Sequence, residues 1–335
     1  MIIFLVFLAL LVLLIIPFLP GIAEIIRKKD ANALFIPEHY ARNPRYFGIS
    51  FKQIIKHAAA GFTVDTEIHD ALLSKKEKLE ILNSTKVSAG EKIDYLLYIK
   101  GDLTSDDNVR FIKEVYITGD ALIGANNIVQ VIAADGNVKV ASGTQFLRWL
   151  DAEGTIEVGE NCNLGICASS GDKLYLAQNC LFRRLFGMPI TTGNIKAAAA
   201  LPKAEFLPLT SAFVRKKDRE IPAGTVIDKH IVFTEDANIG HDAILMGDVK
   251  SYGNVVIEEN ATIHGNVFAD GNIYINSGAK IGGNVFSQKA VYIAMQVVIS
   301  RPDVIKSVVG KKKVRIEQNV TIYGYVTTEG DGITA

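Results

Sequence analysis

Along most of the chain, apolar and polar residues follow one another in units of six. From Val249 these units read VKSYGN, VVIEEN, ATIHGN, VFADGN, IYINSG, AKIGGN, VFSQKA and VYIAMQ, with an apolar or small residue at the first and third positions. Because residues two apart lie on the same face of a strand, each unit predicts a short strand with two inward side chains. Most units end in Asn or Gly, which tolerate the left-handed backbone of a sharp corner.

Three units make a longer period. Ile257, Ile275 and Ile293 follow one another at intervals of eighteen residues. A chain that returns to the same place at this interval forms a three-sided β-solenoid, whose strands pair with the rung below at a spacing of about 4.8 Å. The sequence therefore predicts an all-β fold, a three-sided β-helix of about 18 residues per rung, preceded by an N-terminal transmembrane helix.

The same period occurs earlier in the chain in a more degenerate form. Val138, Ile156 and Leu174 again follow one another at intervals of eighteen residues. Near the C-terminus, the distance from Gly283 to Gly324 is 41 residues, or two rungs plus five, so we expect an inserted loop around residues 302–313. The run of basic residues at 311–313 would then lie in that loop.

These patterns divide the chain into six parts. The predicted ranges are 1–23 for a transmembrane helix, 24–78 for a partly helical juxtamembrane connector, 79–190 for a first β-helical block, 191–222 for a linker or excursion, 223–330 for a second β-helical block and 331–335 for a tail. Within the connector, FKQIIK from Phe51 has helical spacing, and SKKEKLEIL from Ser74 favours a short helix or the run-in to a strand. The linker is predicted because an alanine run and three prolines break the six-residue register.

The first nineteen residues contain no charged or polar side chain. At 1.5 Å per residue, about 20 helical residues span the roughly 30 Å hydrocarbon layer, so this segment predicts a membrane helix. Arg27, Lys28 and Lys29 follow directly, and basic residues on that side oppose translocation. They predict a single-pass protein of the inner (cytoplasmic) membrane with its β-helix in the cytoplasm. A cleaved signal peptide is the alternative, but no basic segment precedes the apolar run, which is long for that role.

Composition adds one feature to this picture, the distribution of charge. The chain has 36 basic and 36 acidic residues, and 49% of it is apolar, which excludes a disordered polar protein and gives no sign of nucleic-acid binding. Yet the first 60 residues hold seven Lys and Arg against three Asp and Glu, so a basic membrane-proximal segment balances an acidic remainder. Arg27, Lys28 and Lys29 are therefore candidates for contact with an anionic membrane surface. Solvated charges on a short helix are the alternative interpretation.

The three cysteines exclude a disulfide scaffold, and an odd number fits a reducing compartment. Cys162 and Cys180 are eighteen residues apart, and Thr144 completes the column. We expect small buried thiols there, at the inward position that Ala261 and Ala279 fill in the second block. A metal site or a disulfide is the less favoured interpretation of the same spacing.

Motifs that carry catalysis or bind cofactors are absent from the sequence, which has no phosphate-binding glycine loop, no HExxH, no CxxC and no GxSxG. We therefore predict no enzyme activity, no catalytic residue, no cofactor and no metal site. A repeat array of this kind favours a structural role, because strands at an open solenoid end can pair with another molecule. Tyr323, Tyr325 and Val326 are the candidates for such a self-assembly contact.

The rungs from Glu259 to Phe286 resemble those of the bactofilins, a family of bacterial polymer-forming cytoskeletal proteins. The resemblance rests on ENATIHGNV, FADGNIYI and SGAKIGGNVF, is clearest over residues 223–326 and has a weaker counterpart at 109–188. It implies a right-handed β-helix that assembles end to end into nonpolar, nucleotide-free filaments and scaffolds envelope-building enzymes at the cytoplasmic membrane. The implied partners are the lipid bilayer through residues 1–23, further copies of the chain in a homopolymer, and unidentified envelope or cell-wall proteins, without nucleic acid. Unlike typical members, this chain has two blocks and a membrane segment.

Two other functions fit the repeat. Left-handed hexapeptide acyltransferases also have eighteen-residue rungs, and His241 or His264 would then be the candidate general base. An exported surface solenoid would follow from the signal-peptide interpretation. The lack of a convergent polar site favours the membrane-anchored scaffold over the enzyme.

Overall fold

The computed structural model describes residues 43–62, 66–68, 78–193, 202 and 204–335, together with Phe4, Phe7 and residues 16–18. The chain divides into two units, Met1–Asn43 and Pro44–Ala335. In the first unit, η1 (Ile16–Phe18) is a short 3-10 helix. The second unit contains helix α4 (Tyr46–Ala58) and all the described strands.

The described residues include no helix with the length and apolar character needed to cross a membrane. The transmembrane helix predicted at 1–23 falls almost entirely on residues outside the described set, and so do Arg27, Lys28 and Lys29. In the connector, the helical spacing predicted from Phe51 is confirmed, since that residue lies within α4.

The first β-helical block ends at Thr192, two residues beyond its predicted boundary. Its strands, with β1 beside them, are β1 (Thr66–Ile68), β2 (Leu79–Val87), β3 (Lys92–Ile93), β4 (Leu96–Ser105), β5 (Arg110–Ile117), β6 (Ala121–Ile123), β7 (Ile128–Ala134), β8 (Val138–Val140), β9 (Gln145–Ala152), β10 (Ile156–Val158), β11 (Cys167–Ser170), β12 (Leu174–Leu176) and β13 (Leu181–Thr192).

The second block follows the same plan. Its strands are β14 (Phe213–Lys216), β15 (Glu220–Ile221), β16 (Val226–Ile227), β17 (His230–Phe233), β18 (Ala237–Ile239), β19 (Ile244–Leu245), β20 (Val249–Ser251), β21 (Val255–Ile257), β22 (Thr262–Ile263), β23 (Val267–Ala269), β24 (Ile273–Ile275), β25 (Lys280–Ile281), β26 (Val285–Ser287), β27 (Ala290–Ile293), β28 (Val298–Ile299), β29 (Lys306–Gly310), β30 (Lys313–Ile316) and β31 (Thr321–Thr334).

The predicted β-solenoid is confirmed, with about 14 turns and a spacing near 18 residues. Ile257, Ile275 and Ile293 pair in parallel from rung to rung, and none is more than 1% exposed. Burying such a side chain contributes roughly 1.5–3 kcal/mol. The inward residues of both blocks form one hydrophobic core, which is the main source of stability of this unit.

The corners of the second block are of two kinds. Asn260 has a φ of 58°, which is the left-handed backbone that the sequence pattern predicts. At the other corners the asparagines form ladders, in which Oδ1 of Asn254 accepts the N–H of Asn272 and Oδ1 of Asn266 accepts the N–H of Asn284, both at 2.8 Å. The left-handed interpretation is therefore wrong for Asn254 and Asn266. Their amide groups satisfy the backbone of the next rung instead.

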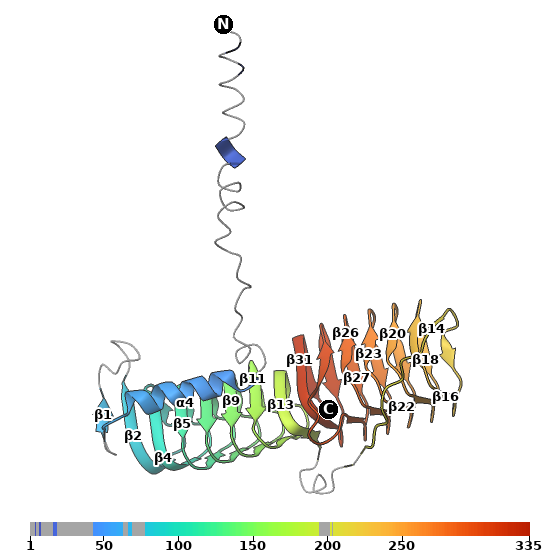
Figure 1. Cartoon of the computed structure of the whole chain (residues 1–335). Coiled ribbons are helices and arrows are strands. Elements are labelled where there is room, and N and C mark those ends of the chain that lie inside the picture. The colour runs from blue at the N-terminus through green and yellow to red at the C-terminus, as the bar shows by residue number, and fades with distance from the viewer. Residues whose placement is uncertain are drawn as a thin grey trace. The chain divides into compact units, whose positions relative to one another are not determined.

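The two blocks meet end to end through their last rungs. β13 pairs antiparallel with β31, with Leu181 opposite Ile333, Leu185 opposite Val326 and Thr191 opposite Thr321. The chain thus leaves the first block at the joint, passes to the far end of the second block at β14, and winds back to the joint (Figure 1). We call the pairing of β13 with β31 the joint, and the end rung formed by β14, β15 and β16 the β14 pole.

The second block begins earlier and continues further than the sequence predicts. β14 and β15 lie inside the predicted linker and pair with β17 and β18. The repeat is hidden there because β14 is packed on one side only, and none of its four residues is fully buried. At the other end, the predicted tail at 331–335 is mostly strand, because Asp331 to Thr334 of β31 pair with β30.

The inserted loop holds five extra residues, as the spacing predicts, but it is shorter than expected. Val285 pairs with Val308, which is 23 residues further along, or one rung of eighteen plus five. The extra residues lie between β28 and β29. Lys311 and Lys312 therefore form the corner before β30, and Lys313 begins that strand, so the basic run belongs to a regular rung.

Candidate functional site

Helix α4 packs along one face of the first block, where it covers outward side chains of several rungs (Figure 1). Its residue Ile55 is fully buried against Tyr98 and Tyr116, whose rings stack with centroids 4.9 Å apart. Near the start of the helix, Phe47 stacks on Trp149 with centroids 4.6 Å apart. Apolar and aromatic contacts of this kind are the main source of stability for a short helix on a sheet.

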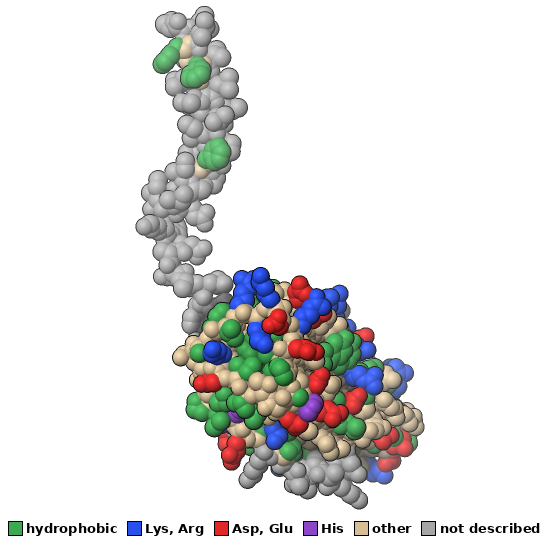
Figure 2. Space-filling model, turned by 90° about the vertical axis from the view of Figure 1, so that its right-hand side faces the viewer, with side chains coloured by type: hydrophobic (Ala, Val, Ile, Leu, Met, Phe, Trp, Pro, Cys, Tyr) green, Lys and Arg blue, Asp and Glu red, His purple; other side chains and the backbone are tan. Residues whose placement is uncertain are grey.

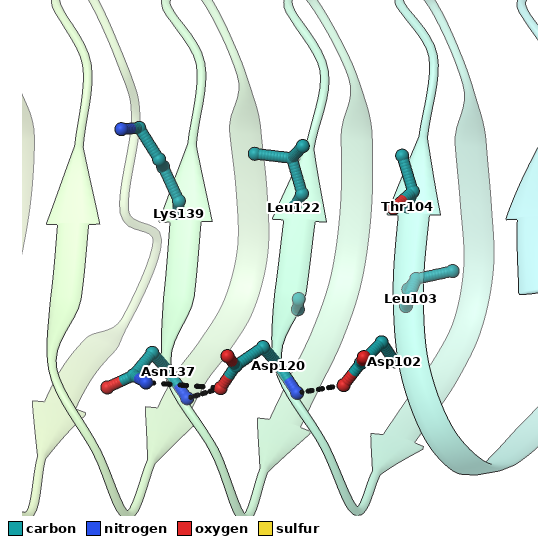
Figure 3. Close-up of a pocket in the computed structure, with 8 residues that line it drawn as sticks. Asp102, Leu103, Thr104, Asp120, Leu122, Asn137 and Lys139 are labelled. Atoms are coloured by element: carbon teal, nitrogen blue, oxygen red, sulfur yellow. Dashed lines mark hydrogen bonds between the residues drawn. The ribbon is translucent and has the colours of Figure 1, made fainter. Parts of the chain in front are cut away.

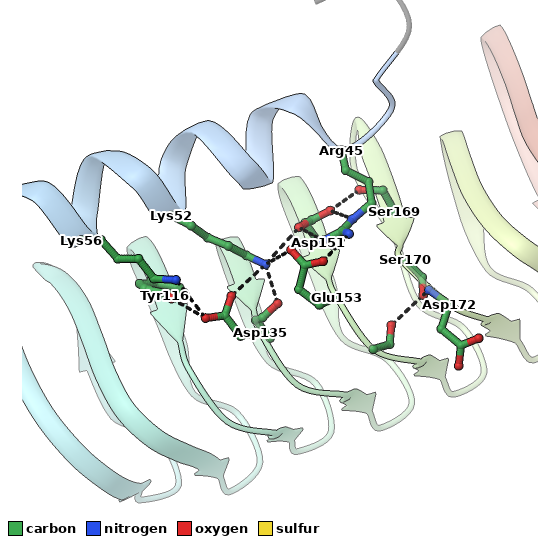
Figure 4. Close-up of polar contacts among 12 residues, drawn as sticks. Arg45, Lys52, Lys56, Tyr116, Asp135, Asp151, Glu153, Ser169, Ser170 and Asp172 are labelled. Carbon is green, nitrogen blue, oxygen red and sulfur yellow. Dashed lines mark hydrogen bonds and ion pairs between the residues drawn. The ribbon is translucent and has the colours of Figure 1, made fainter. Parts of the chain in front are cut away.

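Buried charges fix the position of α4 on this face (Figure 4). Asp151 accepts hydrogen bonds from Nε and Nη2 of Arg45, both at 2.9 Å, and from Oγ of Ser169 at 2.8 Å. Nζ of Lys52 lies 3.2 Å from Asp135 and 3.5 Å from Asp151. Arg45, Lys52 and Asp151 are only 9%, 4% and 2% exposed. Because buried charges are tolerated only when paired, this network selects one position for the helix.

Two further carboxylates lie at the rim of the network, and their pKa values are low. Hydrogen bonds from Nη1 of Arg45 at 2.7 Å and Nζ of Lys52 at 3.2 Å favour ionised Glu153, and the Arg45 bond in particular lowers the Glu153 pKa to about 2. Burial opposes the corresponding shift at Asp135. A hydrogen bond from the Tyr116 hydroxyl at 2.5 Å, with the charge of Lys52, still holds the Asp135 pKa below its ordinary value.

We predict that acid detaches α4. The stability that a carboxylate with a lowered pKa adds is complete above its unfolded pKa and is lost as the pH falls toward its folded pKa. For Glu153 this window runs from 4.5 down to about 2. Trp149 is the one tryptophan of the chain, so its fluorescence should report the loss of the Phe47 stack in this window. Glu153→Gln should flatten the transition, and an emission spectrum that is constant down to pH 2 would contradict the prediction.

The predicted self-assembly residues all lie on β31, at the joint. Tyr323 is 3% exposed, Val326 is fully buried, and the Tyr325 ring packs against Phe186 with centroids 4.9 Å apart. The edge of β31 that faces away from the second block is paired with β13. The end contact that the sequence places here is therefore made within the chain, to the first block.

Buried hydroxyl groups complete the hydrogen bonds of the joint. Oγ1 of Thr334 accepts the N–H of Cys180 at 2.9 Å and donates to the carbonyl of Ala177 at 2.7 Å. From the other block, Oγ1 of Thr192 accepts the N–H of Val320 at 3.2 Å. Because each hydroxyl satisfies backbone groups that would otherwise be buried without a partner, opening the joint without letting water in is costly.

The β14 pole differs from the joint because its outer strand edges are open. Within the described part of the chain, β14, β15 and β16 have strand partners on one side only. Phe213 and Val226 are 63% and 65% exposed there, and Val214 and Ile227 cap the core incompletely. Figure 2 looks onto this end and shows apolar side chains among the backbone and charged groups. At the opposite end, β1 pairs antiparallel with Leu79 to Ile81 of β2.

The cysteine column lies where the sequence predicts. Cys162 and Cys180 are 1% and 0% exposed, and Thr144 is fully buried in the same column. The thiols donate to the carbonyls of Ala141 at 3.3 Å and Gly159 at 3.2 Å, and both cysteines are free. The neighbouring Cys180 sulfur and burial raise the pKa of Cys162. These groups therefore act as small apolar core residues.

The histidines considered as general bases do not converge on a site. His241 is exposed, with Nδ1 2.9 Å from Asp242. His264 is 8% exposed, lies at another corner, and uses Nδ1 to accept the N–H of Leu207 at 2.7 Å. Burial lowers the pKa of His264, which keeps this nitrogen free to accept. Leu207 belongs to the segment that enters β14, so His264 holds that segment against the second block.

A shallow groove on the first block carries two carboxylates, and both are engaged in the corner structure (Figure 3). Oδ1 of Asp102 accepts the N–H of Asp120 at 2.8 Å, and Oδ1 of Asp120 accepts the N–H of Asn137 at 2.7 Å. Lys139, which lines the groove, lies 3.3 Å from Glu157. The groove thus repeats the ladder of the second block, with Asp in place of Asn.

Across the residues that the structure describes, no group of three or more His, Cys, Asp or Glu side chains is arranged to hold a metal ion. Comparison of the chain with protein-family models, with curated proteins and with solved structures finds no match. The function must therefore be inferred from the surfaces of this chain, of which the β14 pole is the most distinctive.

Proposed function

We propose that the chain is a membrane-anchored, self-assembling β-helical scaffold of the bactofilin kind, which organises envelope or morphogenesis proteins at the cytoplasmic membrane and catalyses no reaction. The observation that carries the proposal is the β14 pole. It presents open strand edges and the exposed apolar residues Phe213 and Val226, on a unit whose other block end is already joined. Open edges of this kind are templates for pairing with another chain.

The joint supplies a template for contact between two copies. In the joint, two terminal rungs pair antiparallel along their length, and their cores become continuous. The same arrangement between two β14 poles gives a two-fold symmetric, self-complementary contact. Arg215 and Lys216 on β14 repel their counterparts in an unspecific pairing, so salt should strengthen assembly by screening them.

Anchoring complements this contact. In the proposal, residues 1–23 cross the inner membrane once, the β-helix lies in the cytoplasm, and Arg27, Lys28 and Lys29 contact anionic headgroups. Contact at the β14 pole alone gives pairs of chains. Filaments need a second contact at the β2 end, where β1 already covers part of the edge.

We predict that the full-length protein in detergent forms pole-to-pole assemblies, and that Phe213→Glu with Val226→Glu abolishes them. Two carboxylates in an apolar contact should raise the dissociation constant by at least about 100-fold. Both side chains are more than 60% exposed, so the fold should tolerate the change. Sedimentation velocity and electron microscopy measure assembly, and Leu122→Glu, at a residue 48% exposed on the first block, is the matched control. A wild-type protein that stays monomeric at every concentration and salt would contradict the proposal.

A further inference from the structure

We propose that one corner of the β-helical unit, which crosses the joint, is a docking surface for anionic lipid headgroups. It consists of Arg148, Arg183, Arg184, Lys311 and Lys312, all exposed, and we call it the basic ridge. The inference rests on the proposed membrane anchoring and goes beyond it, because it assigns the face of the β-helix that lies on the bilayer.

The joint brings these residues into line. In the first block, the N–H of Ile166 donates to the carbonyl of Arg148 at 2.8 Å, and β13 with its two arginines forms the next rung. β13 pairs with β31, where the N–H of Glu329 donates to the carbonyl of Lys311 at 3.2 Å (Figure 1). Four steps of about 4.8 Å give the ridge a length of roughly 19 Å. Residues far apart in the sequence thus form one continuous surface.

Charge and apolar exposure on the ridge match a lipid surface. No ion pair joins any of the five cations to a described acidic side chain, and the nearby acids Glu329 and Asp331 leave the ridge net positive. Apolar side chains lie among the cations, with Leu147, Ile166 and Leu181 49%, 39% and 43% exposed. Anionic leaflets attract such basic clusters, and exposed apolar groups between them can enter the headgroup boundary.

The connection to the N-terminal segment favours the membrane as the partner. The chain enters the β-helical unit at Pro44 and begins α4 at Tyr46. Phe47 stacks on Trp149, and the guanidinium of Arg148 lies 5.0 Å from the centre of the same indole ring. One end of the ridge therefore lies beside the first element that follows the proposed anchor. A tethered rod meets the bilayer most readily with the surface beside its tether.

The single tryptophan makes this inference testable in the full-length protein. Trp149 adjoins the ridge, so energy transfer from it to a dansyl lipid reports the approach of this surface to the bilayer. The protein is reconstituted into phosphatidylcholine vesicles, with or without phosphatidylglycerol. We expect higher transfer with phosphatidylglycerol, and its loss when salt is added.

The variant Arg183→Ser, Arg184→Ser, Lys311→Ser leaves Arg148 and the tryptophan environment unchanged. Each basic residue at an anionic surface raises the docked population roughly fivefold, so the ratio of docked to undocked chains should fall about 100-fold. A matched control removes three exposed cations elsewhere, Arg110, Lys250 and Lys280, and should keep the wild-type transfer.

Vesicle flotation separates the two proposals. If the wild-type protein floats with both lipid mixtures but transfers equally in both, the basic ridge is not a lipid surface, while anchoring stands. Transfer that persists in the triple variant overturns the ridge as well. If the protein floats with neither mixture, the anchoring proposal fails first.

Discussion

Asp151→Ala is expected to release α4 from the first block, at a cost of about 3–5 kcal/mol in the free energy that holds the helix in place. The carboxylate of Asp151 is 2% exposed and accepts two hydrogen bonds from Arg45, and Nζ of Lys52 lies 3.5 Å away. Without it, two buried cations lose their closest counter-charge. Hydrogen exchange of the α4 amides should accelerate, while exchange in the rungs of the second block stays slow.

Two comparisons separate the charge from the packing. Glu153→Gln should cost under about 1 kcal/mol, because the Glu153 side chain is 46% exposed and water screens its pairs. Replacing the whole network, with Arg45→Met, Lys52→Met and Asp151→Leu, should restore much of the protection, because no unpaired charge is then buried. Unchanged exchange of α4 in Asp151→Ala would show that apolar contacts alone hold the helix.

Val326→Asp is expected to open the joint while both blocks stay folded. Val326 is fully buried and lies opposite Leu185 across the joint. An aspartate there costs several kcal/mol as long as it is dry, and opening the joint lets water reach it. Residues of β13 and β31 should lose hydrogen-exchange protection together, and small-angle scattering should show a change in the longest dimension of the molecule.

Matched variants test whether the joint itself responds. Gly332→Val should act in the same direction, because a Cβ at Gly332 would lie 2.3 Å from the ring of Phe182 and 2.6 Å from its carbonyl oxygen. Val226→Asp places the same charge at the exposed β14 pole, and the joint should stay protected. If Val326→Asp instead unfolds both blocks, they depend on each other and the joint is no separable contact.

The fold class follows from the period of the sequence because a solenoid is built from local repeats. Val285 and Val308 show this well, since counting residues between them reveals one rung and five extra residues. Local chemistry is less certain. Asn260 and Asn254 stand at the same place in the six-residue unit, yet one adopts the left-handed backbone and the other forms a ladder. Which one occurs depends on the shape of each corner, and the residue type alone does not specify it.

The α4 network is beyond the reach of sequence patterns. Arg45 and Asp151 are 106 residues apart and share no repeat relation, because the helix crosses the rungs whereas the period runs along them. A weak signal exists in Asp151 itself, a charged residue inside the strand that ends QFLRWLDA. That signal suggests a buried polar partner without naming it.

By itself, the sequence determined the repeat, its inward residues, the inserted residues and the cysteine column, because each depends on the spacing between neighbouring rungs. Only the tertiary structure decided how the blocks are joined. Either order of the two blocks satisfies the alternation within each rung, and the antiparallel pairing of Leu185 with Val326 appears only when both chain paths are placed in space. That pairing covers the predicted assembly residues, leaves the β14 pole open, and aligns the basic ridge. The physical reason is that strand edges are shared between distant segments, whereas the period describes adjacent ones.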